Sequence, residues 1–190
     1  MIIEDLLFCL KSFILGIVEG VTEFLPISST GHLIVFEDLL QFQSSEQYVN
    51  TYSYVIQLGA ILAVVVLYFP KLWPFCSSKN GWIKKDTWIL WFKVLVAALP
   101  AAIIGLPFDD LLDKLFYNYQ TVAVTLILYG VLFIVVENYN KNRRPQTRKL
   151  GALPWSTALL IGVFQILALI PGTSRSGSTI LGAILLGCSR

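Results

Sequence analysis

Charged residues are scarce in this sequence, and their scarcity argues against a soluble protein. Aspartate, glutamate, lysine and arginine make up only 14% of the 190 residues, whereas hydrophobic residues make up 56%. Soluble domains usually carry about 25% charged residues and about 45–50% apolar residues. A soluble fold of this size would leave much of its apolar surface in contact with water. The composition therefore predicts an integral membrane protein, as does the mean hydropathy of +0.71.

Cysteine is also rare, and the net charge is small. The three cysteines, Cys9, Cys76 and Cys188, are far apart and form no CxxC pair, so they predict neither a metal site nor a disulfide framework. A net charge of +2, without basic residues interleaved with exposed aromatics, argues against nucleic acid as a partner. The N-terminal MIIEDLLFCLK lacks the basic start of a secretory signal, so we interpret it as part of the mature protein.

Three apolar segments are long enough to cross a membrane, which requires about 20 mostly apolar residues. They are residues 50–69, 87–106 and 119–137, and the first is expected to stop at Pro70. Among the polar residues in these segments are an amide, Gln57, and a lysine, Lys93. We interpret Gln57 as a helix-packing residue and Lys93 as a side chain that extends to the basic interface.

The charges between these segments orient them. The loop after the first span and the stretch after the third are basic, and the loop between them is acidic. The charged residues are, in order, Lys71, Lys79, Lys84, Lys85 and Asp86; Asp109, Asp110, Asp113 and Lys114; and Lys141, Arg143, Arg144, Arg148 and Lys149. Because short basic loops stay in the cytoplasm, the acidic loop and residue 50 are expected outside. The basic tract 141–149 is interpreted as a topology signal rather than a ligand site.

Two further hydrophobic regions are each interrupted by a polar motif. Region 2–40 contains EGVTEFLPISSTGH, and region 153–190 contains PGTSRSGST. Each half is too short or too broken for a comfortable single span. Proline, glycine and hydroxyl groups at membrane depth are tolerated only where they are buried in protein or line a wet cavity. We therefore expect two re-entrant helical hairpins.

The two interrupted regions also resemble each other. GIVEGVTEFLPISSTG aligns with GVFQILALIPGTSRSG, so that Glu19 lies opposite Gln165 and Pro26 opposite Pro171. An odd number of spans separates them, which is typical of an inverted repeat whose binding site lies where the broken elements meet. Chance similarity between two small-residue turns is the alternative.

The expected fold class is therefore all-α, a polytopic membrane protein with an inverted repeat and two re-entrant hairpins. Residues 1–190 form a single membrane domain in this interpretation. The first repeat covers 1–138, and 151–190 begins a second repeat. Three spans follow the first hairpin, whereas the sequence stops at Arg190 directly after the second, so the second repeat is expected to be truncated.

The first motif combines acidic, hydroxyl and imidazole groups. Glu19 and Glu23 are four residues apart, so both carboxylates project from one face of a helix. Carboxylates at membrane depth generally face a cavity and pair with a cation, although a helix end near the headgroups is the simpler alternative. His32, the only histidine, follows three hydroxyl residues, and its titration near neutrality suits acid–base or nucleophilic chemistry.

The second motif contains an arginine in a turn rich in glycine and hydroxyl groups. The planar guanidinium of Arg175 can bind two phosphate oxygens, while the N–H groups and dipole of a following helix add further attraction. An interfacial arginine that binds lipid headgroups is the alternative. We expect Arg175 to be the residue most directly involved in function.

Together, EGVTEFLPISSTGH and PGTSRSG resemble the two motifs of the bacitracin-resistance family of undecaprenyl pyrophosphate phosphatases. The resemblance extends through VIQLGAILAVVV and FQILALIPG to the final LLGCSR. It implies a multi-pass enzyme of the bacterial inner membrane, with an active site facing the periplasm or exterior. Such an enzyme removes one phosphate from undecaprenyl pyrophosphate, and the monophosphate carrier is reused for cell-wall synthesis.

The resemblance also implies roles for particular residues. It implies a divalent cation, Mg²⁺ or Ca²⁺, for which Glu19 and Glu23 would be the ligands. The implied catalytic residues are Glu19, Glu23, His32 and Arg175, and the implied substrate-binding residues are Ser28, Ser29, Ser174 and Thr179. His32 would act either as a nucleophile or as a base for a serine or water, with a slight preference for its direct participation.

Two other functions are compatible with the sequence. A transporter or lipid flippase would also use inverted, broken helices, although it would not need paired glutamates, serines, histidine and arginine together. A truncated, inactive member of the family is the second alternative, and it rests on the position of Arg190. The oligomeric state stays open, with a homo-oligomer among the alternatives.

Overall fold

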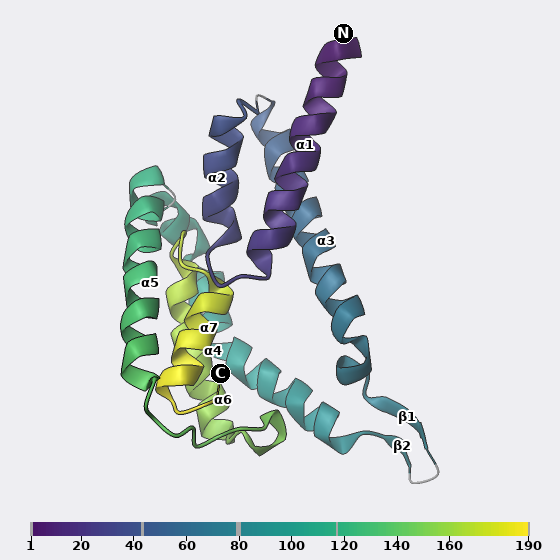
Figure 1. Cartoon of the computed structure of the whole chain (residues 1–190), viewed down its shortest axis with the longest axis vertical. Coiled ribbons are helices and arrows are strands. Elements are labelled where there is room, and N and C mark those ends of the chain that lie inside the picture. The colour runs from purple at the N-terminus through teal and green to yellow at the C-terminus, as the bar shows by residue number, and fades with distance from the viewer. Residues whose placement is uncertain (1, 43, 79–80, 117, 190) are drawn as a thin grey trace.

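The computed structural model describes residues 2–42, 44–78, 81–116 and 118–189, and most of them are helical (Figure 1). The elements are α1 (Ile2–Glu23), α2 (Ser29–Leu39), α3 (Glu46–Leu72), β1 (Phe75–Ser78), β2 (Gly81–Ile83), α4 (Lys85–Phe116), α5 (Tyr119–Asn140), η1 (Leu150–Ala152), α6 (Trp155–Gln165), η2 (Ile166–Leu169) and α7 (Arg175–Leu185). The predicted all-α class is confirmed.

Three helices have the length and composition to cross a membrane. The apolar stretches are Gln47–Leu72 in α3, Lys85–Phe108 in α4 and Gln120–Asn140 in α5, and they coincide with the three predicted spans. Large apolar side chains are exposed along all three, as expected for helices that face lipid. The expected end at Pro70 is wrong, because α3 continues to Leu72. A proline this close to the end of a helix has little helix left to disrupt.

Each interrupted region forms a helical hairpin. α1 packs against α2, and α6 packs against α7. Helices α2, α6 and α7 have 11 residues each, whereas α1 has 22 and is longer than expected for half of a broken span. Figure 1 shows the turn between α1 and α2 close to the start of α7, near the centre of the molecule. The depth of the hairpins in a membrane, the inverted repeat and the boundaries 1–138 and 151–190 stay predictions.

A short β-hairpin between α3 and α4 was not predicted. Its strands are antiparallel, with Phe75 opposite Ile83 and Ser78 opposite Gly81. The Asn80-Gly81 dipeptide in the sequence is a common signal for such a hairpin. Several residues of the predictions lie outside the described part of the structure: Lys79, Arg190 and the side chains of Cys76, Asp109, Asp110 and Asp113.

Helices α4 and α6 pack with very little space between them. A Cβ atom at Gly162 of α6 would lie 2.8 Å from the carbonyl carbon of Ala97 and closer still to its oxygen. One turn before Ala97, Lys93 is only 4% exposed. Its Nζ donates to the Gly151 carbonyl at 3.2 Å and lies 5.7 Å from the centroid of the Trp155 ring. The Lys93 side chain therefore reaches the segment that follows the basic tract and is covered there by η1 and the start of α6, and its extension to the membrane interface stays a prediction.

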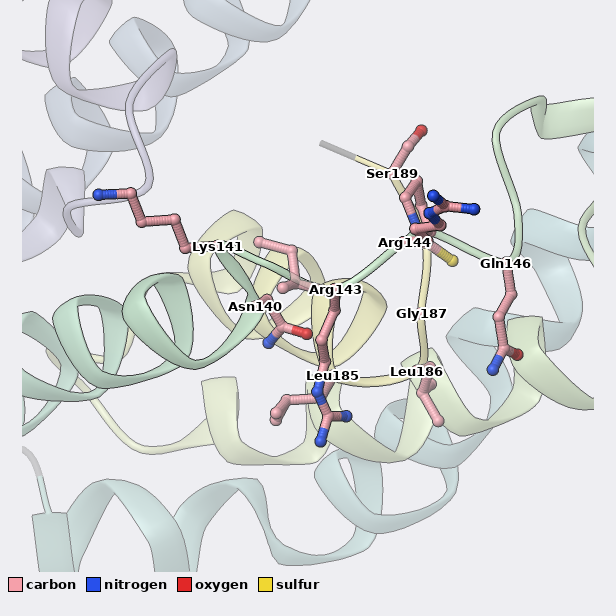
Figure 2. A pocket seen from close by; sticks show the side chains of 12 residues that line it. Asn140, Lys141, Arg143, Arg144, Gln146, Leu185, Leu186, Gly187 and Ser189 are labelled. Atoms are coloured by element: carbon pink, nitrogen blue, oxygen red, sulfur yellow. The ribbon is translucent and has the colours of Figure 1, made fainter.

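The loop between α5 and α6 and the end of α7 enclose a basic hollow of about 440 Å³ (Figure 2). Backbone bonds join the two segments, from Gln146 N to Gly187 O and from Ser189 N to Thr147 O, both at 2.8 Å. Figure 2 shows the Lys141 side chain pointing away from that of Arg144. Because these cations diverge, the hollow does not focus positive charge on one point, and we retain the interpretation of this tract as a topology signal.

Candidate active site

The polar turns of the two hairpins meet in one pocket of about 250 Å³. The first hairpin contributes carboxylate and hydroxyl groups, the second contributes hydroxyl and guanidinium groups, and α3 closes one side. The lining residues are Thr22, Glu23, Leu25, Ser28, Ser29, Thr30, Gln57, Ile61 and residues 168–176. The structure thus brings together five of the eight predicted site residues: Glu23, Ser28, Ser29, Ser174 and Arg175.

Two helices begin at this pocket. The Ser28 hydroxyl caps α2 by accepting a hydrogen bond from Gly31 N at 3.4 Å, and the Ser174 hydroxyl caps α7 by accepting from Gly177 N at 3.1 Å. The N-terminus of a helix carries partial positive charge and unpaired N–H groups, which attract phosphate. The pocket therefore receives the positive ends of two helices, one from each motif.

The backbone is strained where the first motif enters α2. Ser28 has φ 61° and ψ 91°, in the left-handed region that residues other than glycine rarely occupy. Such a conformation costs about 1–3 kcal/mol and is found most often at functional sites. The next residue, Ser29, donates its hydroxyl proton to Glu23 Oε2 at 2.6 Å. The strained turn thus places a hydroxyl directly on the carboxylate that lines the pocket.

Glu19 lies one helical turn before Glu23 and is completely buried. Neither of its carboxylate oxygens has a hydrogen-bond partner among the described residues. A buried carboxylate without a partner is costly, so this position requires either a proton or a cation. No cluster of three or more histidine, cysteine, aspartate or glutamate residues occurs in the described part of the chain. Mg²⁺ commonly needs only one or two carboxylates, with substrate phosphates and water as its other ligands, so the Glu19–Glu23 pair fits such an ion.

Two predicted site residues contact the motif turns without lining the pocket. His32 Nδ1 lies 2.9 Å from the Ser28 carbonyl oxygen. Because a carbonyl only accepts, Nδ1 carries the proton, and Nε2 is the acceptor in the neutral ring. The Thr179 hydroxyl lies 3.2 Å from Arg175 O and 3.0 Å from Ser176 O, within the first turns of α7. His32 and Thr179 thus bond to the backbone that presents the pocket residues.

The Arg175 side chain is exposed and lines the pocket. Within the described residues its guanidinium makes neither an ion pair nor a hydrogen bond. All five of its N–H donors are therefore available to a ligand. Among the described residues, Arg175 therefore makes no side-chain interaction that would stabilise the fold.

Gln57 is the residue in the pocket that sequence reasoning missed. We interpreted it as a packing residue, but it lines the pocket together with Ile61, one helical turn further along α3. A polar amide in the middle of an apolar span is unusual, and it could have indicated that this part of α3 lines a polar site. The sequence does not reveal which face of α3 meets the hairpins, and that contact decides its surroundings.

The fold and the pocket define a polytopic helical membrane protein whose polar site joins two hairpin motifs. A sequence profile described as "Bacitracin resistance protein BacA" matches residues 12–190, and the chain belongs to that family. The resemblance drawn from the two motifs is thereby confirmed.

Curated relatives agree with this assignment. The undecaprenyl-diphosphatase of Acetivibrio thermocellus is 60% identical over 181 residues, 95% of this chain and 66% of that protein. The enzyme of the same name from Enterococcus faecalis is 60% identical over 180 residues, 95% of this chain and 65% of that protein. The one from Lactiplantibacillus plantarum is 58% identical over 180 residues, with 95% and 66% covered. The chain thus spans just under two thirds of the length of these relatives.

Proposed function

We propose that this chain is a membrane phosphatase that hydrolyses undecaprenyl pyrophosphate to undecaprenyl phosphate and inorganic phosphate. The observation that carries the proposal is the single pocket in which Arg175 of the second motif meets the Glu23–Ser29 pair of the first. The names of the relatives support the substrate. Such an activity would return the lipid carrier to cell-wall synthesis, and it accords with the bacitracin resistance in the family description.

In this proposal, the groups of the pocket serve the hydrolysis of a pyrophosphate. Overall, the oxygen of water bonds to the terminal phosphorus, directly or after transfer of the phosphoryl group to His32 or a serine. The bond from this phosphorus to the bridging oxygen breaks, and undecaprenyl phosphate and inorganic phosphate are the products. Negative charge on the phosphoryl oxygens must be stabilised throughout. The Arg175 fork would bind two of these oxygens, and the free N–H groups at the starts of α2 and α7 would bind others.

Glu19 and Glu23 would hold the divalent cation in this proposal. When bound, Mg²⁺ or Ca²⁺ would neutralise part of the pyrophosphate charge. We expect a chelator to abolish phosphate release by the purified chain and added Mg²⁺ or Ca²⁺ to restore it. A Glu19→Gln variant keeps the size of the side chain but loses the charge, so it should need a higher metal concentration for half-maximal release. Release that is unchanged by both treatments would contradict the cation site.

His32 is proposed to act either as a nucleophile or as a base for a serine or water. Removing a general base typically costs about 10²–10⁴-fold in rate. We therefore expect His32→Gln to reduce phosphate release by about that factor, because glutamine does not titrate near neutrality. The glutamine amide retains a donor that can bond to the Ser28 carbonyl, so the turn should keep its conformation. Full turnover by this variant would remove His32 from the chemistry.

We place the protein in the bacterial inner membrane with the pocket closer to the exterior. The charges of the loops put the start of α5 outside. Thr125 of α5 touches the second motif and lies six residues after Tyr119, so this contact is only about 9 Å along the helix from its outer end. The basic hollow at the other end of α5 would then face the cytoplasm.

A further inference from the structure

One face of α5 touches the motif turns of both hairpins. A Cβ atom added at Gly31 of the first motif would lie 3.1 Å from Leu126 Cδ1. Gly172 of the second motif has φ 86°, and a Cβ there would lie 2.9 Å from Val122 O and closer still to the Thr125 hydroxyl. α5 packs against both α2 and α7, and Figure 1 shows α5 running beside α7. α5 is therefore in contact with both halves of the site.

Two hydroxyl groups of α5 bond to the second motif. Thr125 and Tyr129 are four residues apart and lie on the same face of the helix. The Thr125 hydroxyl lies 2.8 Å from the Pro171 carbonyl oxygen, and its single proton is shared with two carbonyls of its own helix, those of Thr121 at 2.9 Å and Val122 at 3.0 Å. The Tyr129 hydroxyl lies 3.0 Å from the Ser178 hydroxyl oxygen. These bonds hold the second motif at Pro171, within the stretch that lines the pocket, and at Ser178, two residues after the end of that stretch.

The direction of the Tyr129–Ser178 bond follows from the number of protons available. Ser178 is 1% exposed, and its hydroxyl donates to the Ser174 carbonyl at 3.1 Å. A serine hydroxyl has one proton, so in the bond between the two hydroxyls Tyr129 is the donor. A chain of hydrogen bonds therefore runs from Tyr129 through Ser178 to the backbone of Ser174, directly before Arg175.

We propose that Thr125 and Tyr129 are positioning residues, whose hydrogen bonds to Pro171 and Ser178 keep Arg175 aligned with the Glu23–Ser29 pair across the pocket. The proposal rests on the phosphatase function proposed above. The Arg175 guanidinium has no partner of its own in the described structure, so its position depends on the backbone from which it extends. A displacement of about 1 Å in such a group can cost about 10²-fold in rate.

The test is a double-mutant cycle on phosphate release with the variants Tyr129→Phe, Ser178→Ala and the two combined. Phenylalanine keeps the ring and removes only the donor. We expect each single variant to lower kcat/KM about tenfold, mainly through kcat. The Tyr129–Ser178 hydrogen bond aligns the site and makes no contact with the substrate, so KM should change little. The double variant should be no slower than the slower single one, because both changes remove the same bond. Independent, multiplicative losses would contradict the proposal.

A control at Tyr54 and two substitutions at Thr125 separate a positioning role from a general loss of folding. Tyr54→Phe removes a tyrosine hydroxyl from the exposed surface of α3, outside the pocket, and should leave kcat and KM unchanged. Thr125→Val removes the donor to Pro171 and should lower kcat/KM about tenfold, whereas Thr125→Ser retains the hydroxyl and should recover most of it. Equal effects of valine and serine would contradict the proposal.

Amide hydrogen exchange provides a measurement that does not depend on activity. The Gly177 and Ser178 amides, which bond to the Ser174 side chain and carbonyl, should exchange about tenfold faster in Tyr129→Phe than in the unchanged protein. If the unchanged protein released no phosphate, the proposed function would fail, and exchange would still decide the positioning claim. Unchanged exchange, or full turnover by Tyr129→Phe, would overturn the positioning proposal itself.

Discussion

Replacing Arg175 with alanine should reduce phosphate release from undecaprenyl pyrophosphate by about 10³-fold. The guanidinium lines the pocket and makes no ion pair or hydrogen bond within the described structure, so its donors are free for the substrate. Removing a preorganised donor costs about 10²–10³ in rate, and losing an arginine from a phosphoryl-transfer site costs about 10³–10⁵. Because Arg175 has no structural partner, the thermal unfolding temperature of the variant should stay within about 2 °C of the original. The measurement is phosphate release by purified variants in detergent.

Two further variants test whether the lower rate of Arg175→Ala comes from the loss of a phosphate-binding guanidinium. Arg175→Lys retains the charge but loses the planar fork, so it should recover only part of the rate. Arg144→Ala removes an exposed arginine of the basic hollow, away from the pocket, and should release phosphate normally. A full rate in Arg175→Ala, or an equal loss in Arg144→Ala, would show that Arg175 does not bind the reacting phosphate.

Replacing Gly162 with alanine should cause the largest loss of stability among single-methyl substitutions in the described helices. The added Cβ would lie 2.8 Å from the Ala97 carbonyl carbon and 2.9 Å from its Cα, so it would collide with the backbone of α4. Overpacking of this kind costs about 1–3 kcal/mol, and more where the neighbour cannot move. We expect the thermal unfolding temperature in detergent to fall by about 5–10 °C.

The matched control for Gly162 is Gly130, in the middle of α5. A Cβ at Gly130 would meet nothing within 4 Å. Because alanine favours helix over glycine by up to about 1 kcal/mol, Gly130→Ala should be neutral or stabilising. Equal unfolding temperatures for the two variants would contradict the close packing of α4 on α6.

The sequence was sufficient to predict the spans and the two hairpins, because both depend on local properties. A run of about 20 apolar residues must cross the bilayer, and a proline- and glycine-bearing motif interrupts a helix wherever it lies. The helix caps were not predicted, although they are also local, since Ser28 and Ser174 stand directly before the helices that they cap. The family could also be recognised from the two motifs alone.

Tertiary packing was harder to predict. Lys93 is buried because η1 and the start of α6 fold over it, and Gln57 lines the pocket because its face of α3 meets the hairpins. His32 stands next to the site residues in sequence, yet its ring contacts the Ser28 carbonyl and does not line the pocket. Such placements depend on contacts between segments far apart in the chain, and hydrophobic periodicity does not encode them.

A lipid transporter is the main rival to the phosphatase, because transporters also build their sites where two broken hairpins meet. A transporter would bind the pyrophosphate lipid and move it without breaking a bond. The Glu23–Ser29 hydrogen bond favours chemistry at phosphorus, as does Arg175, which lines the same pocket and has no partner among the described residues. The two functions differ in one product, inorganic phosphate.

The most direct test is therefore the release of inorganic phosphate from undecaprenyl pyrophosphate by the purified chain, with Mg²⁺ or Ca²⁺ present and after chelation. We predict rapid, metal-dependent release with undecaprenyl phosphate as the second product. No release from a well-folded, metal-loaded sample would contradict the proposed phosphatase activity of this chain.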